Sequence, residues 1–141
     1  MENCIFCNII KGSIPGHVIY ENEEVLVFLD ISQTTKGHTL VIPKNHQTDI
    51  FHMTEEQMIS VFAVVPKIAK GLKAAFGSEG LNLVNNNGAV AGQTVFHYHV
   101  HLIPRYAGDG FGIDFPNNMA DYDAESLSRL KEKIKVSMGE Q

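Results

Sequence analysis

The chain has 141 residues and a mass of 15.6 kDa, which fits one domain of ordinary size and leaves no room for a second independent core. Hydrophobic residues make up 44% of the chain and charged residues 19%, a composition typical of a packed globular protein. Sixteen acidic and eleven basic residues give a net charge of -5 without any basic block, which argues against polymeric nucleic acid and anionic membranes as partners. A single mononucleotide remains possible, because backbone N–H groups and a few side chains can hold one phosphate.

The first residues lack the basic start of a signal peptide, and no apolar run approaches the roughly 18 residues of a membrane span. We therefore expect a cytoplasmic protein. Both cysteines of the chain lie in the segment Cys4-Ile5-Phe6-Cys7. In a reducing compartment this spacing indicates half of a metal site or a redox pair, and a structural disulfide is not expected. A pair of free, buried cysteines is the plain alternative.

Short runs rich in β-branched and aromatic residues, bounded by turn residues, predict five strands. They cover residues 18–20, 25–29, 39–42, 81–85 and 96–104. Between the third and fourth strands, apolar residues recur every three or four positions and predict one long helix from Thr54 to Phe76. Thr54 starts a capping box and Gly77 is a stop signal, while Pro66 predicts a kink near residues 62–66.

The end of the chain has a different character. Residues 107–118 are rich in glycine and predict a connecting loop, and residues 124–136 predict a second helix with Asp123 near its start. Strands, a long helix and then more strands indicate an antiparallel α+β domain, because the βαβ alternation of a parallel sheet is missing. We assign the loop and helix of residues 107–141 to the same folding unit as the strands.

Three of the seven histidines alternate in the run His97-Tyr98-His99-Val100-His101. Alternate side chains of a strand share a face at a spacing of about 6.6 to 6.8 Å, so the imidazoles should point to one side of the sheet. Such a row can be a solvated sheet face, a Zn²⁺ site with an open position for hydrolysis, or a centre for covalent catalysis. In the last case a neutral imidazole attacks phosphorus while a protonated neighbour supplies the leaving group with a proton. The spacing alone does not decide between metal and covalent chemistry.

The run resembles the histidine triad His-φ-His-φ-His-φ-φ, with φ hydrophobic, which names the HIT superfamily of nucleotide hydrolases and transferases. Further segments that resemble the family occur in the same order at residues 4–10, 27–32, 37–44 and 91–96. The resemblance extends from about Asn3 to Tyr106 and places the HIT domain at residues 1–106. It is strongest to the bacterial Hit proteins and the Hint phosphoramidases. It implies a HIT-like fold: a five-stranded antiparallel sheet with one long helix and a C-terminal helix.

The resemblance also implies catalytic roles. His99 would attack the α-phosphate and carry a transient nucleotidyl group, and we expect its imidazole to be accessible to solvent. His101 would contact the phosphate and protonate the leaving group, a role that suits a near-neutral pKa. His38 would complete the histidine set from a neighbouring strand. His17 and His52 match no motif, and we expect them at the surface.

Nucleotide-binding positions follow from the same resemblance. Asp30 comes directly after a strand, where a turn or cap is the plain role and a hydrogen-bonded ribose diol is the role the family implies. The apolar positions that sandwich the base match Ile5, Phe6, Ile9, Ile14, Phe28 and Ile31, although each could equally be a core residue. The phosphate-contacting positions match Asn86, Gly92, Gln93 and Thr94. A hairpin turn at Asn87-Gly88 would explain the same glycine-rich stretch.

A tetrahedral zinc site needs two ligands in addition to Cys4 and Cys7. Zinc-bearing relatives suggest His46 and the first triad residue, His97. We expect one structural Zn²⁺ per chain that the chemistry does not require. A ligated His97 cannot act as a base, which leaves the other two triad histidines free for catalysis.

These observations predict a purine nucleotide-binding hydrolase that cleaves at the α-phosphate, a nucleoside phosphoramidase acting through a nucleotidyl-histidine. One alternative is a dinucleoside polyphosphate hydrolase that uses the same His99 chemistry. Another is a nucleotide-binding interaction protein whose turnover is incidental. The expected partners are a purine mononucleotide or nucleoside phosphoramidate and a second copy of the chain. A homodimer is expected because the Thr54–Phe76 helix has more apolar surface than a small sheet can cover.

Overall fold

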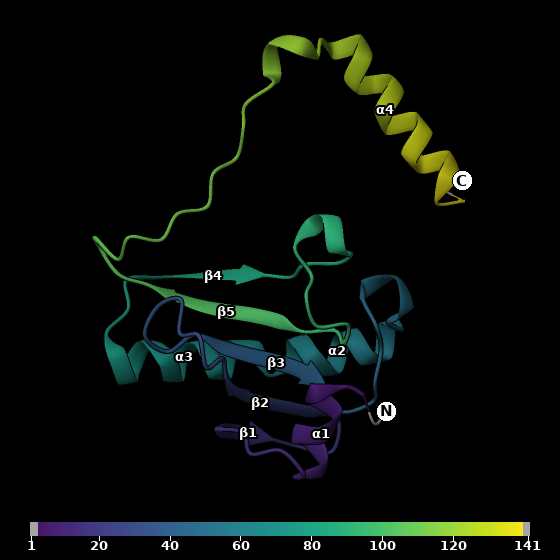
Figure 1. The fold of residues 1–141 in the computed structure, drawn as a ribbon. Coiled ribbons are helices and arrows are strands. Elements are labelled where there is room, and N and C mark those ends of the chain that lie inside the picture. Colours follow the sequence, from purple (N-terminus) through teal and green to yellow (C-terminus); the bar gives the residue numbers. More distant parts are fainter. Residues whose placement is uncertain (1–2, 140–141) are drawn as a thin grey trace. The chain divides into compact units, whose positions relative to one another are not determined.

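A computed structural model describes residues 3–139. Within this range five strands form one antiparallel sheet in the order β1-β2-β3-β5-β4 (Figure 1). The strands are β1 (Val18–Glu21), β2 (Val25–Leu29), β3 (Thr39–Pro43), β4 (Gly80–Val84) and β5 (Val100–Arg105). The predicted α+β fold with a five-stranded antiparallel sheet is confirmed. Strand β5 contains His101, the last residue of the triad. It is an interior strand, paired to β3 on one side and to β4 on the other.

The start of β5 differs from the prediction. We expected a strand from Phe96, but the ladder between β3 and β5 runs only from Thr39↔Leu102 to Val41↔Val100. Pro43, further along β3, has no N–H group to donate, and its carbonyl oxygen accepts a hydrogen bond from the His97 side chain instead. His97 and His99 therefore lie in an irregular segment just before β5.

The predicted long helix is divided into α2 (Glu55–Ala63) and α3 (Val65–Phe76), which confirms the expected kink. Pro66 lies in the first turn of α3, where its missing N–H group does no harm to the helix. The capping box at Thr54 is present, and Gly77 ends α3 in the left-handed conformation with a φ of 67°.

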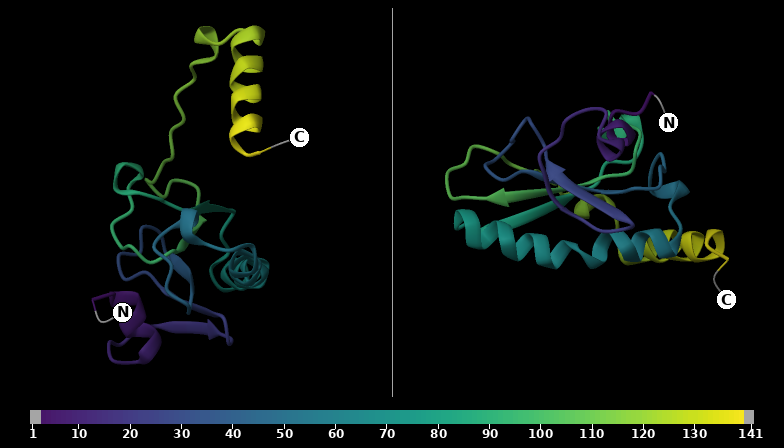
Figure 2. Two further views of the ribbon diagram at one scale, coloured as in Figure 1. Left: turned by 90° about the vertical axis from the view of Figure 1, so that its right-hand side faces the viewer. Right: turned by 90° about the horizontal axis from the view of Figure 1, so that it is seen from below.

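Helices cover both faces of the sheet (Figure 2, right). One core cluster joins Val27, Val100 and Leu102 to residues of α2 and α3. The other joins Leu26, Phe28, Leu40 and Ile42 to Phe6 of a short helix, α1 (Ile5–Lys11). Helix α1 carries no clear start signal in the sequence and was not predicted, because its N-cap is Cys4, which is not among the usual capping residues.

The chain divides into two compact units, the first ending at Phe111 and the second beginning at Gly112. The second unit contains the short 3₁₀ turn η3 (Met119–Asp121) and the helix α4 (Ala124–Ser137). Asp123 caps α4 through a hydrogen bond from the Ser126 N–H group, which confirms the predicted second helix. That residues 107–141 form one folding unit with the strands stays a prediction. Among the helices of residues 3–139, none is both long and apolar enough to cross a lipid bilayer.

Candidate active site and metal centre

The triad side chains alternate between the two faces of the sheet as predicted. Tyr98, Val100 and Leu102 are buried in the core cluster beneath α2 and α3. The ring of Phe6, on the α1 side, lies 5.8 Å from the ring centre of His97 and 5.2 Å from that of His99. The rings of His99 and His101 are 5.0 Å apart. The three imidazoles therefore share the α1 face, even where the regular strand has not yet begun.

The hydrogen bonds of His99 define which ring nitrogen is reactive. Its Nδ1–H group donates to the carbonyl oxygen of His97 at 2.7 Å, so the network assigns the free lone pair to Nε2. The ring is 6% exposed, which corrects the expectation of a solvent-accessible imidazole. Burial lowers the pKa of His99, against the opposing effects of the His97 carbonyl and of Asp30. At neutral pH His99 is therefore an uncharged imidazole with an available lone pair.

His38 and His101 form a directed pair. The backbone N–H group of Thr34 donates to His38 Nδ1 at 3.2 Å, which leaves the proton of the ring on Nε2. His38 Nε2 lies 2.9 Å from His101 Nδ1 and donates to it, so His101 carries its own proton on Nε2. His38 thus joins the histidine set as expected, although it lies directly before β3 and not within a strand.

The expected near-neutral pKa of His101 is wrong for the free protein. Burial lowers this pKa to about 4, and the nearby His99 and His38 disfavour a positive charge further. Burial also lowers the pKa of His38, although Asp30 opposes that effect. His101 is thus a neutral hydrogen-bond donor in the free protein at neutral pH.

Asp30 directly follows β2 and has two distinct oxygens. Oδ1 accepts from the N–H group of Ser32 at 2.8 Å and from its hydroxyl at 2.6 Å, which forms the plain turn that the sequence suggested. Oδ2 lies 3.6 Å from His38 Nε2, beyond hydrogen-bonding distance. Burial raises the pKa of Asp30, but the hydrogen bonds from Ser32 outweigh it and the pKa is lowered. The carboxylate is ionised, and Oδ2 can accept a further donor.

A cavity of about 210 Å³ opens beside Asp30. All of the apolar residues expected around the base line it: Ile5, Phe6, Ile9, Ile14, Phe28 and Ile31. Phe6 and Phe28 contact each other edge to face with ring centres 5.4 Å apart, and Ile31 at the rim is 89% exposed. His17 also lines this cavity and is exposed, as expected for a surface residue. No sequence motif places His17 at this cavity. Its backbone carbonyl oxygen accepts a hydrogen bond from the Leu29 N–H group, which holds it there.

The segment between β4 and the triad contains the four residues assigned to phosphate binding. Gly92 has a φ of 97° at the end of the 3₁₀ turn η2 (Ala89–Ala91), and both Gly92 and Thr94 are exposed. Asn86 packs close to Gly92. Gln93 differs, because its buried side chain donates to the carbonyl oxygens of Thr48 and Val95 and accepts from the Gly88 N–H group. Its amide holds the loop together.

Sequence reasoning missed one residue of this loop. The Asn85 side chain donates to the carbonyl oxygen of His99 at 2.9 Å, and the Asn87 side chain donates to Asn85 Oδ1 at 2.8 Å. Of the three consecutive asparagines at positions 85 to 87, the register of β4 against β5 shows which one reaches the backbone of His99.

The four residues predicted to hold a metal lie together, with all ligand atoms within 4.8 Å of one another. His46 Nδ1 and His97 Nδ1 are 3.1 Å apart, while Cys4 Sγ lies 3.3 Å from His97 Nδ1 and Cys7 Sγ 3.4 Å from His46 Nδ1. Tetrahedral zinc would separate two nitrogens by about 3.3 Å and a nitrogen from a sulfur by about 3.6 Å. His97 Nε2–H donates to the Pro43 carbonyl oxygen at 2.8 Å, which turns the lone pair of Nδ1 toward the cysteines. The donor set therefore fits Zn²⁺.

The protonation states also suit metal binding. Burial lowers the pKa of His97 to about 4 and lowers that of His46, so both imidazoles are neutral ligands at neutral pH. Burial, reinforced by Cys4, raises the pKa of the Cys7 thiol. Loading of a metal must therefore release a thiol proton.

Comparison with known proteins gives a consistent result. A family model described as the HIT domain matches residues 11–108. The chain is 54% identical over 134 residues to the protein named Protein hit of Bacillus subtilis, covering 94% of this chain and 92% of that protein. It is 37% identical over 141 residues to a protein of Candida albicans named adenosine 5'-monophosphoramidase, covering 96% of this chain and 91% of that one.

Solved structures agree with the sequence relatives. A HIT family protein from Bacillus anthracis superposes with a TM-score of 0.93 at 55% identity, covering 96% of this chain and 97% of that chain. A structure described as a Zn-bound histidine triad family protein from Mycobacterium smegmatis superposes with a TM-score of 0.75 at 36% identity, covering 94% and 98% of the two chains. With its matching domain model, triad and sheet order, this chain belongs to the HIT family.

Proposed function

We propose that this HIT-family enzyme hydrolyses purine nucleoside phosphoramidates at the α-phosphate. The single observation that carries the proposal is the fixed tautomer of His99, whose Nδ1–H group is engaged by the His97 carbonyl while Nε2 keeps its lone pair. A nucleophile needs this arrangement, and His101 Nε2–H stands beside it as a donor. The adenosine 5'-monophosphoramidase of Candida albicans, 37% identical to this chain, supports the same chemistry.

The reaction would proceed by two displacements. His99 Nε2 attacks the α-phosphorus, the new bond between nitrogen and phosphorus forms, and the bond to the leaving amine breaks. A phosphate oxygen beside His101 raises the pKa of that imidazole from its low value, so that His101 takes up a second proton from solvent and, as the imidazolium, gives its Nε2 proton to the departing nitrogen. Water then attacks the phosphorus of the nucleotidyl-histidine and gives one proton to His101, and the bond between His99 Nε2 and phosphorus breaks, which releases the nucleoside monophosphate and restores His99.

The charges near the site favour a substrate with a single phosphate. Two cations in or next to the segments that resemble the family are already paired, Lys44 with Glu21 at 2.7 Å and Arg105 with Asp109 at 2.8 Å. A polyphosphate would bring several further negative charges, and these two cations are already engaged with carboxylates. An uncharged or cationic amine as the leaving group avoids this cost. The purine would occupy the 210 Å³ cavity, with Asp30 Oδ2 accepting from the ribose diol.

Side-by-side kinetics test the proposal. We expect a higher kcat/KM for adenosine phosphoramidate than for diadenosine tri- or tetraphosphate, and acid-quenched turnover should reveal a chain that carries one AMP moiety on His99. A higher kcat/KM for the polyphosphates would move the enzyme to the alternative hydrolase class. Full turnover without any adducted chain, in wild type and in a slow variant alike, would contradict the covalent route.

We also propose one structural Zn²⁺ per chain, held by Cys4, Cys7, His46 and His97. The atom separations of the donor set and the Zn-bound relative from Mycobacterium smegmatis support it. When bound, the ion would connect the start of α1 to the segments that follow β3 and precede β5. No catalytic step uses it, because His97 is directed away from the α-phosphate by its ligand role.

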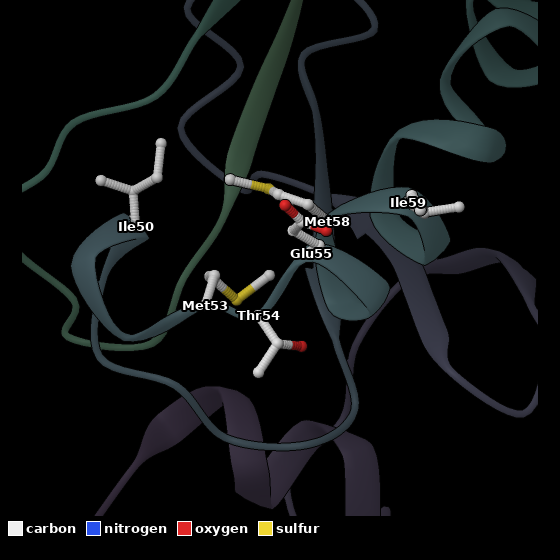
Figure 3. A pocket seen from close by; sticks show the side chains of 6 residues that line it. All are labelled: Ile50, Met53, Thr54, Glu55, Met58 and Ile59. Atoms are coloured by element: carbon white, nitrogen blue, oxygen red, sulfur yellow. The ribbon is translucent and has the colours of Figure 1, made fainter. Parts of the chain in front are cut away.

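A homodimer is proposed from apolar surface. In α2, Ile59 is 68% and Phe62 40% exposed. The turn η1 (Ile50–His52) and the first turns of α2 also enclose a hollow of about 470 Å³, with Met53 and Met58 among its lining side chains (Figure 3). Exposed apolar surface of this kind favours a partner subunit. Light scattering at micromolar concentration should give twice the chain mass, and a mass near 15.6 kDa would refute the dimer.

A further inference from the structure

The segment between β2 and β3 holds two groups of the proposed site at its ends. Asp30 begins the segment beside the base cavity, and His38 ends it in contact with His101. Within residues 3–139, Gln33 in the middle of this segment is the one residue other than glycine with a positive φ, at 45°. Side chains disfavour that conformation, so the surrounding contacts must hold it in place.

The side-chain amide of Gln33 makes those contacts. Its Nε2 donates to the carbonyl oxygen of Asp30 at 2.6 Å and to that of His38 at 2.8 Å. Its Oε1 accepts from the N–H group of Gly37 at 2.8 Å. Both N–H hydrogens of the Gln33 amide thus form hydrogen bonds, one to the first residue of the segment and one to the last. The same side chain therefore holds both ends of the segment.

The segment also determines which ring nitrogens of His38 and His101 carry a proton. Thr34, next to Gln33, directs its N–H group at His38 Nδ1, and this contact places the His38 proton on Nε2 and the His101 proton on its outer nitrogen. Opposite tautomers would leave His101 facing the substrate with a lone pair in place of a donor. Asp30 Oδ1 is fixed by Ser32 of the same segment, which leaves Oδ2 to the sugar.

We propose that Gln33 is a positioning residue that sets ribose recognition by Asp30 and the donor state of His101 together. The inference rests on the proposed function for its ligand, a nucleotide with an intact ribose diol. Gln33 touches neither substrate nor the reacting atoms. It acts through the backbone of the two residues that do.

The Gln33→Gly variant tests this directly, because glycine keeps the positive φ without strain and removes the three side-chain hydrogen bonds. In the wild-type enzyme AMP should bind more tightly than 2',3'-dideoxy-AMP. In the variant this preference should fall by about tenfold, as expected for loss of about one net hydrogen bond to the carboxylate. Imidazole ¹⁵N chemical shifts should show a single tautomer of His38 in wild type and a mixture in the variant.

A matched control is Gln57→Ala. Gln57 closes the capping box of α2 with Thr54, so its loss destabilises the fold without touching the segment from Asp30 to His38. The control should leave both the ribose preference and the His38 tautomer unchanged. If Gln33→Gly fails to fold, Gln33→Asn takes its place, since asparagine tolerates positive φ but is one methylene too short to reach both carbonyls.

The possible results separate the two proposals. An unchanged ribose preference together with an unchanged His38 tautomer in a folded Gln33 variant overturns the positioning role. If wild type binds no AMP at all, the proposed function fails, and the ¹⁵N shifts of the free protein still decide the role of Gln33. Equal losses in Gln57→Ala and Gln33→Gly would show general destabilisation and would also overturn it.

Discussion

Removal of the proposed zinc ion should lower the free energy of unfolding. The size of this loss depends on how many residues separate the ligands along the chain. Cys7 and His46 are 39 residues apart and Cys7 and His97 are 90 apart. A cross-link that closes loops of these lengths lowers the entropy of the unfolded chain, which raises the free energy of that chain by about 4 and about 5 kcal/mol respectively at 25 °C. The two closures share Cys7 and do not add fully, so about 4 kcal/mol is the lower expectation. In a chain of this size that corresponds to a fall in Tm of roughly 10 to 15 °C.

Calorimetry on metal-loaded and chelator-stripped protein measures this fall, with the zinc content of each sample fixed by elemental analysis. The Cys4→Ser variant should lose zinc and melt near the stripped wild type. His52→Ala is the matched control, because His52 is an exposed histidine that contacts Asp49 and lies outside the metal cluster. A stripped protein that melts within about 3 °C of the loaded one would refute the cross-link reasoning. Metal-replete protein without zinc would refute the site itself.

Three further predictions concern the histidines and the charges. His99→Asn should bind AMP within about tenfold of wild type but lose at least about a thousandfold in single-turnover rate, with an unfolding free energy lower by about 1 to 3 kcal/mol because the ring is buried; near-wild-type turnover would exclude it as nucleophile. The pKa of His101 is about 4 in the folded chain and 6.5 in an unfolded one, so the unfolded state binds more protons between these two pH values. Tm should therefore fall as the pH drops from 6.5 toward 4. A His101→Asn variant with an equally steep fall would contradict that origin. Lys44→Ala should leave kcat/KM for the phosphoramidate within about twofold, because the ammonium group is already paired with Glu21, and a larger loss would show that Lys44 meets the substrate.

The fold was largely predictable because its elements follow simple periods. Runs of β-branched and aromatic residues bounded by turn residues indicated the strands, and the three-to-four residue spacing with a capping box and Pro66 indicated both the long helix and its break at Val64. The start of β5 was not predictable from the same pattern, since the ladder ends where Pro43 of a different strand lacks a donor. Helix α1 was not predicted, because its seven residues are too few to show a clear helical period and its N-cap is the thiol of Cys4.

The site was predictable at the level of residue identity and less so at the level of atoms. The alternation of the triad placed the imidazoles on one face. The family motifs named four possible metal ligands that lie together and six apolar residues that line one cavity, and their roles stay predictions. Which nitrogen of His99 is free depends on a backbone carbonyl two residues earlier. The low pKa of His101 depends on burial and on neighbours from another strand. Such properties arise only once the chain is folded, so no spacing rule reveals them.

The separation of chemistry from base contact bears on how this enzyme could change its substrate. The histidines proposed to react lie on or directly before an interior strand of the sheet, whereas the cavity proposed for the base is lined by α1 and by residues at the end of β2. Phe6 is a poor place for variation, because it is buried against both His97 and His99. Ile31 lies at the rim and is nearly fully exposed, so its side chain is not packed against the histidines. Selection or protein engineering could therefore retune base preference at the rim while the reacting centre stays as it is.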